Sequence, residues 1–148
     1  AFAFYRKHVP GFEEATWVDT APQMGTRESR RIHGRYRLTR EDCEAGRQFE
    51  DSVVLNKYHP GGDGHVFGLP YRCLVPAAGP KNLIFSGRNV CVAHEIMDFT
   101  REIPSCACIG QAAGTGAALA LDLDGDVGAV ETARLRKALV DAGAIIAV

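Results

Sequence analysis

The 148-residue sequence has almost no net charge, no paired cysteines and no long apolar run. A net charge of -1 gives no long-range attraction to nucleic acid or to an anionic membrane, so neither partner is predicted. The five cysteines are an odd number without a C-x-x-C pair, which argues against a disulfide framework and indicates a reducing compartment, the cytoplasm. No apolar stretch approaches the roughly 18 to 20 residues of a membrane span.

The first half of the chain has the pattern of a β-rich unit with many turns. Thr39, followed three residues later by Asp42, predicts the start of a short helix that ends near Gly46. Short apolar or alternating segments separated by turn residues predict strands at residues 17–18, 31–38, 51–55, 66–67 and 71–75.

The predicted strand 31–38 has one apolar and one cationic face. Its two alternating sets are Ile32, Gly34, Tyr36 and Leu38 against Arg31, His33, Arg35 and Arg37. The cationic face is either a solvated outer face or a contact for an anionic substrate or cofactor. Positive charge is concentrated between Arg27 and Arg40. Nucleic-acid binding through this stretch is the weakest interpretation, because aromatic residues that could stack on bases are sparse there and basic charge alone gives only nonspecific binding.

The second half changes to an α/β pattern. Residues 82–86 are a compact apolar run before Gly87 and Arg88, which predicts a buried strand whose end opens onto a site. Helices are predicted at 104–123, with a proline in the first turn, and at 131–142, before a glycine stop. Small residues on one face of the first helix would let it approach a neighbour closely; they are Gly110, Ala113, Gly114, Ala117 and Ala120.

Two local patterns in this half are weak. Residues 122–126 look like the start of a calcium loop, but Val127 and Ala133 replace the required Gly and Glu, so no metal site is predicted. Cys106 and Cys108 near a helix start are typical of buried small side chains. A reactive thiol there would have its pKa lowered by the helix N-terminus.

The segment that connects the predicted strand 82–86 to the helix at 104 concentrates polar groups. His94 shares it with Glu95, Asp98 and Arg101. In an enzyme, His94 would be a substrate-side acid–base group and Arg101 an anion-binding group. The equally open alternative is that both side chains pair with nearby carboxylates.

Several sequence blocks occur in a specific order between residues 27 and 143. They are RRIHGRYRLT at 30–39 with Asp42, Phe49 with Asp51 and Ser52, LPYR at 69–72, LVP at 74–76, NLIFSGR at 82–88, HE at 94–95, REIPSC at 101–106 and GQAAGT at 110–115. This order resembles the end of the FAD-dependent oxidoreductase family whose members are often labelled xanthan-lyase-like.

The resemblance implies a fold, a cofactor and a set of site residues. Residues 1–80 would be part of a β-rich substrate domain and residues 81–148 the C-terminal part of a Rossmann-like FAD-binding domain, which is α/β when complete and α+β in isolation. It places Gly87 and Arg88 at the ribityl-pyrophosphate side of FAD, and Ile103, Pro104, Ser105 and Cys106 near the pyrimidine edge of the flavin. Independently of the family, a helix N-terminus stabilises negative charge such as that at flavin N1 and O2 on reduction.

The sequence departs from this family in lacking the strand–GxGxxG–helix start of a dinucleotide-binding fold. The segment GQAAGTG at 110–116 has another spacing and lies within a predicted helix. We therefore expect an N-terminal remainder, in the same or a second polypeptide, and weak or no FAD binding by the lone chain. The predicted function is electron or hydride transfer between a small organic substrate and FAD, with the isolated chain inactive. The alternative is a non-catalytic segment that folds against a partner chain.

Overall fold

An antiparallel hairpin lies at the centre of the protein body in a computed structural model, which describes residues 1–147. Strands β1 (Ser52–Tyr58) and β2 (His65–Pro70) form the hairpin, with an irregularity in β1 between Ser52 and Val54. The helices are α1 (Phe2–His8), α2 (Arg40–Glu44), α3 (Met97–Thr100), α4 (Ile103–Ala120) and α5 (Thr132–Asp141), and single 3-10 turns cover Tyr71–Cys73, Gly87–Asn89, His94–Ile96, Leu121–Leu123 and Val127–Ala129. The chain is thus α+β.

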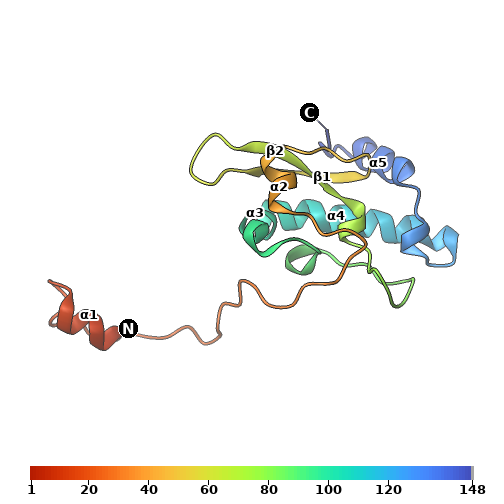
Figure 1. Ribbon diagram of the computed structural model, residues 1–148. Coiled ribbons are helices and arrows are strands. Elements are labelled where there is room, and N and C mark those ends of the chain that lie inside the picture. Colours follow the sequence, from red (N-terminus) through yellow and green to blue (C-terminus); the bar gives the residue numbers. More distant parts are fainter. Residues whose placement is uncertain (148) are drawn as a thin grey trace.

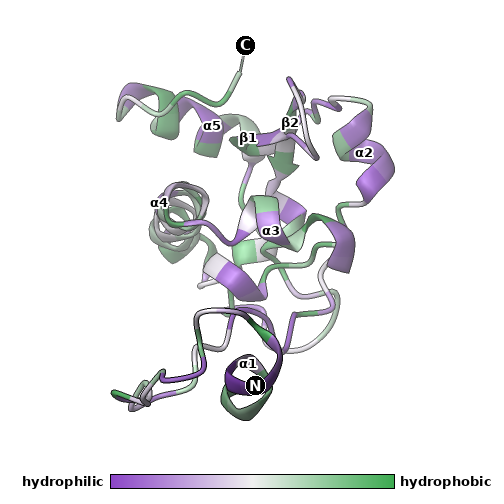
Figure 2. Ribbon diagram, turned by 90° about the vertical axis from the view of Figure 1, so that its left-hand side faces the viewer, coloured by the Kyte–Doolittle hydropathy of each residue, from purple (hydrophilic) through white to green (hydrophobic). Residues whose placement is uncertain are grey.

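Helices cover the hairpin on both sides (Figure 1). Helix α4 packs against β1, α5 packs against both α4 and β1, and α2 contacts β2. Figure 2 shows α4 end-on at one side of the hairpin and α2 at the other. The core draws on both sides of the predicted boundary at residue 80; its most buried large side chains include Leu38, Val54, Phe67, Leu69, Leu74, Ile96, Ile109, Leu135 and Leu139.

The predicted helix start at Thr39 is confirmed. The Asp42 N–H donates to Thr39 Oγ1 over 3.3 Å, and Asp42 Oδ2 accepts from the Thr39 N–H over 3.1 Å, so each residue satisfies a free backbone group of the other. Helix α2 ends just before Gly46, whose φ of 60° suits a residue without a side chain.

Asp42 also anchors this region to the rest of the body. Its carboxylate, in a residue only 5% exposed, accepts hydrogen bonds from Tyr36 Oη over 2.7 Å and from Arg47 over 2.8 Å. Burial acts to raise the pKa of Asp42, but the hydrogen bonds from Tyr36, Arg47 and Thr39 outweigh it and hold the pKa below the usual 3.8.

Replacing Asp42 with asparagine should therefore destabilise the protein in a pH-dependent way. At pH 7 we expect a loss of about 1 to 3 kcal/mol in the free energy of unfolding, because hydrogen bonds to a buried charge are weakened. A group with a lowered pKa stabilises the fold above its unfolded pKa, and this contribution is lost as the pH falls through the folded pKa. Urea unfolding of both proteins at pH 7 and about pH 3 should show the gap narrowing in acid. An equal gap at both pH values would contradict this role.

The buried face of helix α4 overlaps the predicted one only at Ala113 and Ala120. Its buried positions are Ser105, Ile109, Ala112, Ala113, Gly116 and Ala120, whereas Gly114 is exposed and Gly110 and Ala117 are half-buried. The close approach occurs at Gly116, where a Cβ would lie 2.8 Å from Tyr71 Oη. Tyr71 cannot move away freely because its hydroxyl donates to the Val127 carbonyl over 3.0 Å.

We expected no apolar stretch as long as a membrane span, and this expectation is wrong, because one helical segment meets the length and composition of a span. The segment Ile103–Leu123, which includes α4, has 21 residues and contains an 18-residue window that is apolar enough for a span, 28% of which is buried in the described structure. One such helix is weak evidence for a span, because core helices of soluble proteins pass the same test. Helix α4 therefore presents a largely uncovered face of Ile103, alanines and glycines.

Four of the six predicted strands are absent from the described residues 1–147, at 17–18, 31–38, 71–75 and 82–86. Residues 82–86, expected to be a buried strand, are not in a sheet, and Leu83 is 39% exposed. Residues 17–18 are also irregular, and residues 71–75 begin with a 3-10 turn. A strand requires a hydrogen-bonded neighbour, and residues 82–86 make one backbone contact of this kind, from the Phe85 N–H to the Leu74 carbonyl.

The basic stretch 31–38 forms isolated bridges instead of a strand, Gly34 with Pro76 and Leu38 with Val92. Its alternation is nevertheless real, since Gly34 and Leu38 are buried while His33, Arg35 and Arg37 are exposed. The outward side chains differ in role. Arg35 donates to the Gly128 carbonyl over 2.7 Å, and Arg31 pairs with Glu28 over 2.5 Å.

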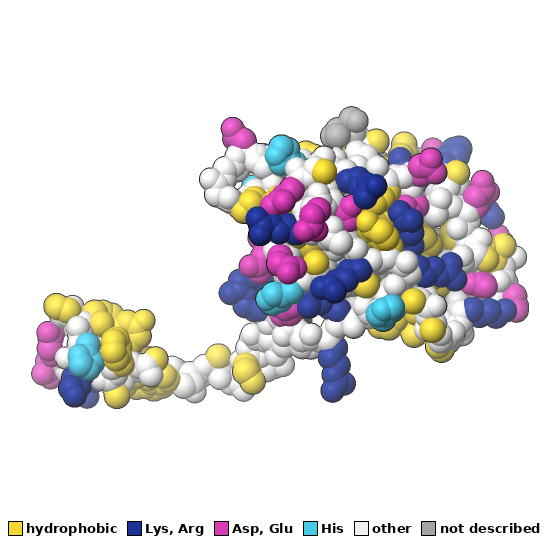
Figure 3. All heavy atoms as spheres, in the orientation of Figure 1, with side chains coloured by type: hydrophobic (Ala, Val, Ile, Leu, Met, Phe, Trp, Pro, Cys, Tyr) yellow, Lys and Arg dark blue, Asp and Glu magenta, His cyan; other side chains and the backbone are white. Residues whose placement is uncertain are grey.

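Residues 1–31 form an arm whose N-terminal part extends away from the body, whereas residues 26–31 lie against it (Figure 1). At its tip, α1 and the following residues fold back on each other, with the Phe2 and Trp17 rings 5.3 Å apart and those of Tyr5 and Phe12 5.5 Å apart. Trp17 remains 58% exposed. Figure 3 shows this tip as a separate cluster of hydrophobic side chains joined to the body by a thin stretch.

Candidate functional site

Two segments far apart in sequence meet at the start of α4. Gly87, with φ at 73°, opens the turn Gly87–Asn89, which packs against α4. A Cβ at Gly87 would lie 4.0 Å from Cys106 Sγ. The structure therefore brings Gly87, Arg88 and Cys106 together, although the predicted strand before them does not form.

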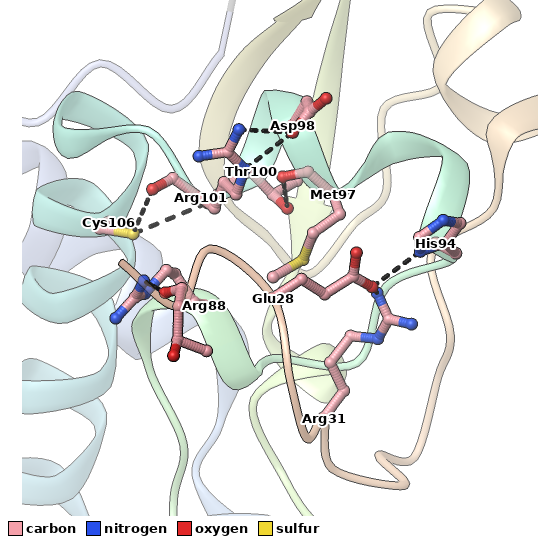
Figure 4. A network of polar contacts seen from close by, with 10 residues as sticks. Glu28, Arg31, Arg88, His94, Met97, Asp98, Thr100, Arg101 and Cys106 are labelled. Carbon is pink, nitrogen blue, oxygen red and sulfur yellow. Dashed lines mark hydrogen bonds and ion pairs between the residues drawn. The ribbon is translucent and has the colours of Figure 1, made fainter. Parts of the chain in front are cut away.

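Arg88 lies where the arm crosses this turn (Figure 4). Its guanidinium donates to the Thr26 carbonyl, and it lines a pocket of about 360 Å³ together with Arg27 and Arg30. Asn89 also lines the pocket, and its buried side-chain Oδ1 has no hydrogen-bond partner among the described residues. The pocket is thus polar and rich in cationic donors.

The N-terminus of α4 offers free backbone donors beside this turn. The N–H groups of Ile103 and Ser105 have no acceptor within residues 1–147, and Pro104 has no N–H. The Ser105 hydroxyl is already used, because it donates to Asn56 Oδ1 over 2.7 Å, with the Phe99 carbonyl at 3.2 Å. The start of this 18-residue helix is therefore able to stabilise an anion through its backbone.

His94 is tied to the arm. Its Nδ1 donates to Glu28 Oε1 over 2.7 Å, and the same carboxylate oxygen accepts from Arg31 over 2.5 Å (Figure 4). The hydrogen bond from His94 is the main reason that the pKa of Glu28 lies below its usual value, against an opposing effect of burial. The side chain of His94 is 71% exposed, so its ring also faces solvent.

Arg101 pairs with the neighbouring Asp98. Its Nε and Nη2 lie 2.7 and 2.6 Å from Asp98 Oδ1, and this hydrogen bond and charge lower the pKa of Asp98. Both His94 and Arg101 thus bind carboxylates in the described structure, as one of the two interpretations of the sequence expects. Their catalytic roles stay predictions.

The pKa of the Cys106 thiol is raised, so the lowering that was expected of a reactive thiol at this helix start is not seen for Cys106. Burial raises the pKa, and the charges of Arg88 and Arg101 oppose this effect without overcoming it. The Cys106 Sγ also donates to the Arg101 carbonyl over 3.2 Å. Cys106 therefore contributes packing beside Gly87 and is held as a thiol.

Sequence reasoning missed the part of the arm that closes this site. Thr26, Arg27, Glu28 and Arg30 lie beside the turn Gly87–Asn89 or beside His94, more than 50 residues away in the sequence. The local excess of positive charge from Arg27 onward was the available signal. It identified a basic stretch but not the segment that it contacts.

The site is a polar pocket with arginines beside the free backbone donors at the start of α4. The sequence matches the FAD dependent oxidoreductase family over residues 1–139, nearly its whole length, and the chain belongs to that family. A search of curated proteins finds no match. A search of solved structures finds no match either.

Proposed function

We propose that this chain is the C-terminal part of a flavoenzyme and supplies one side of its FAD site. The observation that carries the proposal is the meeting of the Gly87–Asn89 turn with the start of α4, in a member of the FAD dependent oxidoreductase family. The order of the sequence blocks supports the finer assignment to the xanthan-lyase-like members and to a Rossmann-like FAD-binding domain.

The residues present at this site suit the phosphate and ribityl groups of FAD. Arg88 would supply a cation for the pyrophosphate, and Gly87 leaves room for close approach because it has no side chain. The N–H groups of Ile103 and Ser105 would stabilise negative charge on the flavin. FAD, when bound, supplies the hydride or electron transfer to or from an organic substrate.

On the substrate side, His94 and Arg101 have distinct tasks in this proposal. His94, exposed and hydrogen-bonded through Nδ1 to Glu28, has its other ring nitrogen available to give or take a proton. Arg101 is held by Asp98 and would bind a substrate anion with its remaining N–H groups. The substrate is a small molecule.

A complete site requires an N-terminal dinucleotide-binding unit, from the same or a second polypeptide. The sequence has no GxGxxG motif, and α4 presents an uncovered face at Ile103 and Gly114 that continues to Leu121 just after the helix. We place this unit on that face. The five thiols are all free, which supports a reducing compartment such as the cytoplasm.

The test is the flavin content of the protein purified under native conditions from the cells that encode it. FAD released by denaturation should be present in stoichiometric amount, and the lone chain produced by itself should take up little. The alternative function, a non-catalytic segment folded against a partner, predicts a stable natively purified assembly without flavin. That result would overturn the proposal.

A further inference from the structure

The pocket beside Arg88 has two cationic side chains without a role in the proposed flavin site. Arg27 and Arg30 come from the arm, and both line the 360 Å³ pocket with Arg88. Within residues 1–147, neither guanidinium has a carboxylate oxygen within 4.0 Å, unlike Arg31, Arg40, Arg47, Arg72, Arg101 and Arg134. Two arginines are therefore gathered in one pocket without a protein anion to pair with.

The arm holds these arginines in place through three contacts with the segment 88–94. Arg88 donates to the Thr26 carbonyl, His94 donates to Glu28, and the Ile32 N–H donates to the Asn89 carbonyl over 2.9 Å. Arg27 and Arg30 lie between the first and last of these contacts. Their backbone is thus anchored on both sides, and both residues line the pocket that Arg88 and Asn89 also line.

The acidic groups near the pocket do not neutralise it. Glu28 lines it as well, but its carboxylate binds Arg31 and His94. Asp98 is bound by Arg101, and the charge of Arg27 contributes to lowering the pKa of Asp98 without an ion pair between them. The other lining groups include Ser29, Ser86 and Asn89, which are neutral and able to hydrogen-bond.

We propose that Arg27 and Arg30 bind an oxyanion, a phosphate or a carboxylate, in this pocket. Planar guanidinium groups match both kinds of anion through paired N–H donors, and the pocket is large enough for such a group but too small for a whole dinucleotide. The proposal rests on the proposed function, which places Arg88 at the cofactor. The oxyanion belongs either to the pyrophosphate of FAD or to an anionic substrate bound next to it.

The test measures binding of inorganic pyrophosphate and of malonate by calorimetry, with the wild-type chain and with the double variant Arg27→Gln/Arg30→Gln. We expect the double variant to bind the better probe at least about tenfold more weakly, since charge-assisted hydrogen bonds are lost. The matched control is Arg37→Gln, which removes one charge from the same basic stretch but lines a different pocket. Its affinity should stay within about twofold, because distant charges are screened.

Two further measurements show where the anion comes from and whether the proposed function stands. If the anion is that of FAD, natively purified flavin-loaded protein will not bind pyrophosphate, whereas an anionic substrate site will still accept malonate. Both results support the inference. If the protein carries no flavin but probe binding depends on Arg27 and Arg30, the inference holds and the proposed function fails. Equal affinity of the double variant and wild type, or no binding of either probe, overturns the inference even where flavin content is normal.

Discussion

Replacing Arg88 with glutamate should lower the FAD occupancy of the natively purified protein at least about tenfold while the chain stays folded. The change puts a carboxylate where the proposed pyrophosphate site needs a cation. A charge-assisted hydrogen bond is worth about 1.5 to 3 kcal/mol, which corresponds to roughly tenfold to more than a hundredfold in affinity. Occupancy is measured as released FAD for each chain.

The control for this prediction is Arg134→Glu. Arg134 lies on α5 and carries the same charge, but it pairs with Asp122 over 3.3 Å, outside the pocket. It should retain wild-type occupancy, and both variants should keep the wild-type circular dichroism spectrum. Unchanged FAD occupancy in the Arg88 variant would show that Arg88 does not bind the pyrophosphate. It would also weaken the proposal that the Gly87–Asn89 turn lies at the FAD site.

Leucine at two neighbouring glycines of α4 should have opposite effects on stability. At Gly116, a Cβ would lie 2.8 Å from Tyr71 Oη, so leucine would overpack the core. We expect the free energy of unfolding to fall by about 1 to 3 kcal/mol. At Gly114 no atom lies within 4 Å of a Cβ, so leucine fits and its higher helix propensity should add about 0.5 to 1 kcal/mol. Denaturant unfolding of the purified chain measures both changes.

The two variants should differ in flavin content in the opposite sense to their stability, with Gly114→Leu losing more FAD than Gly116→Leu. In the proposal, the exposed face of α4 contacts the dinucleotide-binding unit, and a leucine at Gly114 would hold that unit away from the helix. We therefore expect severalfold lower FAD occupancy in Gly114→Leu although its chain is the more stable of the two. Normal flavin content in Gly114→Leu would show that the missing unit does not pack on this face.

Elements with strong local signals were predictable. The Thr39 and Asp42 pair identified the start of α2, and helical periodicity with a proline start and a glycine stop identified α4 and α5. The hairpin strands were also found, because each is a short apolar segment next to a turn rich in glycine. Motif order alone was sufficient for the FAD dependent oxidoreductase family.

Features that depend on distant neighbours were not predictable in the same way. An apolar run such as residues 82–86 forms a strand only beside another strand, and no such partner lies among residues 1–147. The buried face of α4 is set by where Tyr71 and β1 lie, so its register differs from the face of small residues seen in the sequence. The pKa of Cys106 depends on burial, which opposes the expected effect of the helix N-terminus.

The sequence by itself determined the positions of α2, α4 and α5, the alternation at residues 31–38 and the family, because each depends on residues close together along the chain or on their order. Only the tertiary structure decided that the arm crosses the turn Gly87–Asn89, joining Glu28 to His94 and Thr26 to Arg88. Those contacts bridge more than 60 residues, and no local propensity specifies which distant segment a side chain will meet. The pocket of Arg27, Arg30 and Arg88 exists because packing of the body brings these segments together.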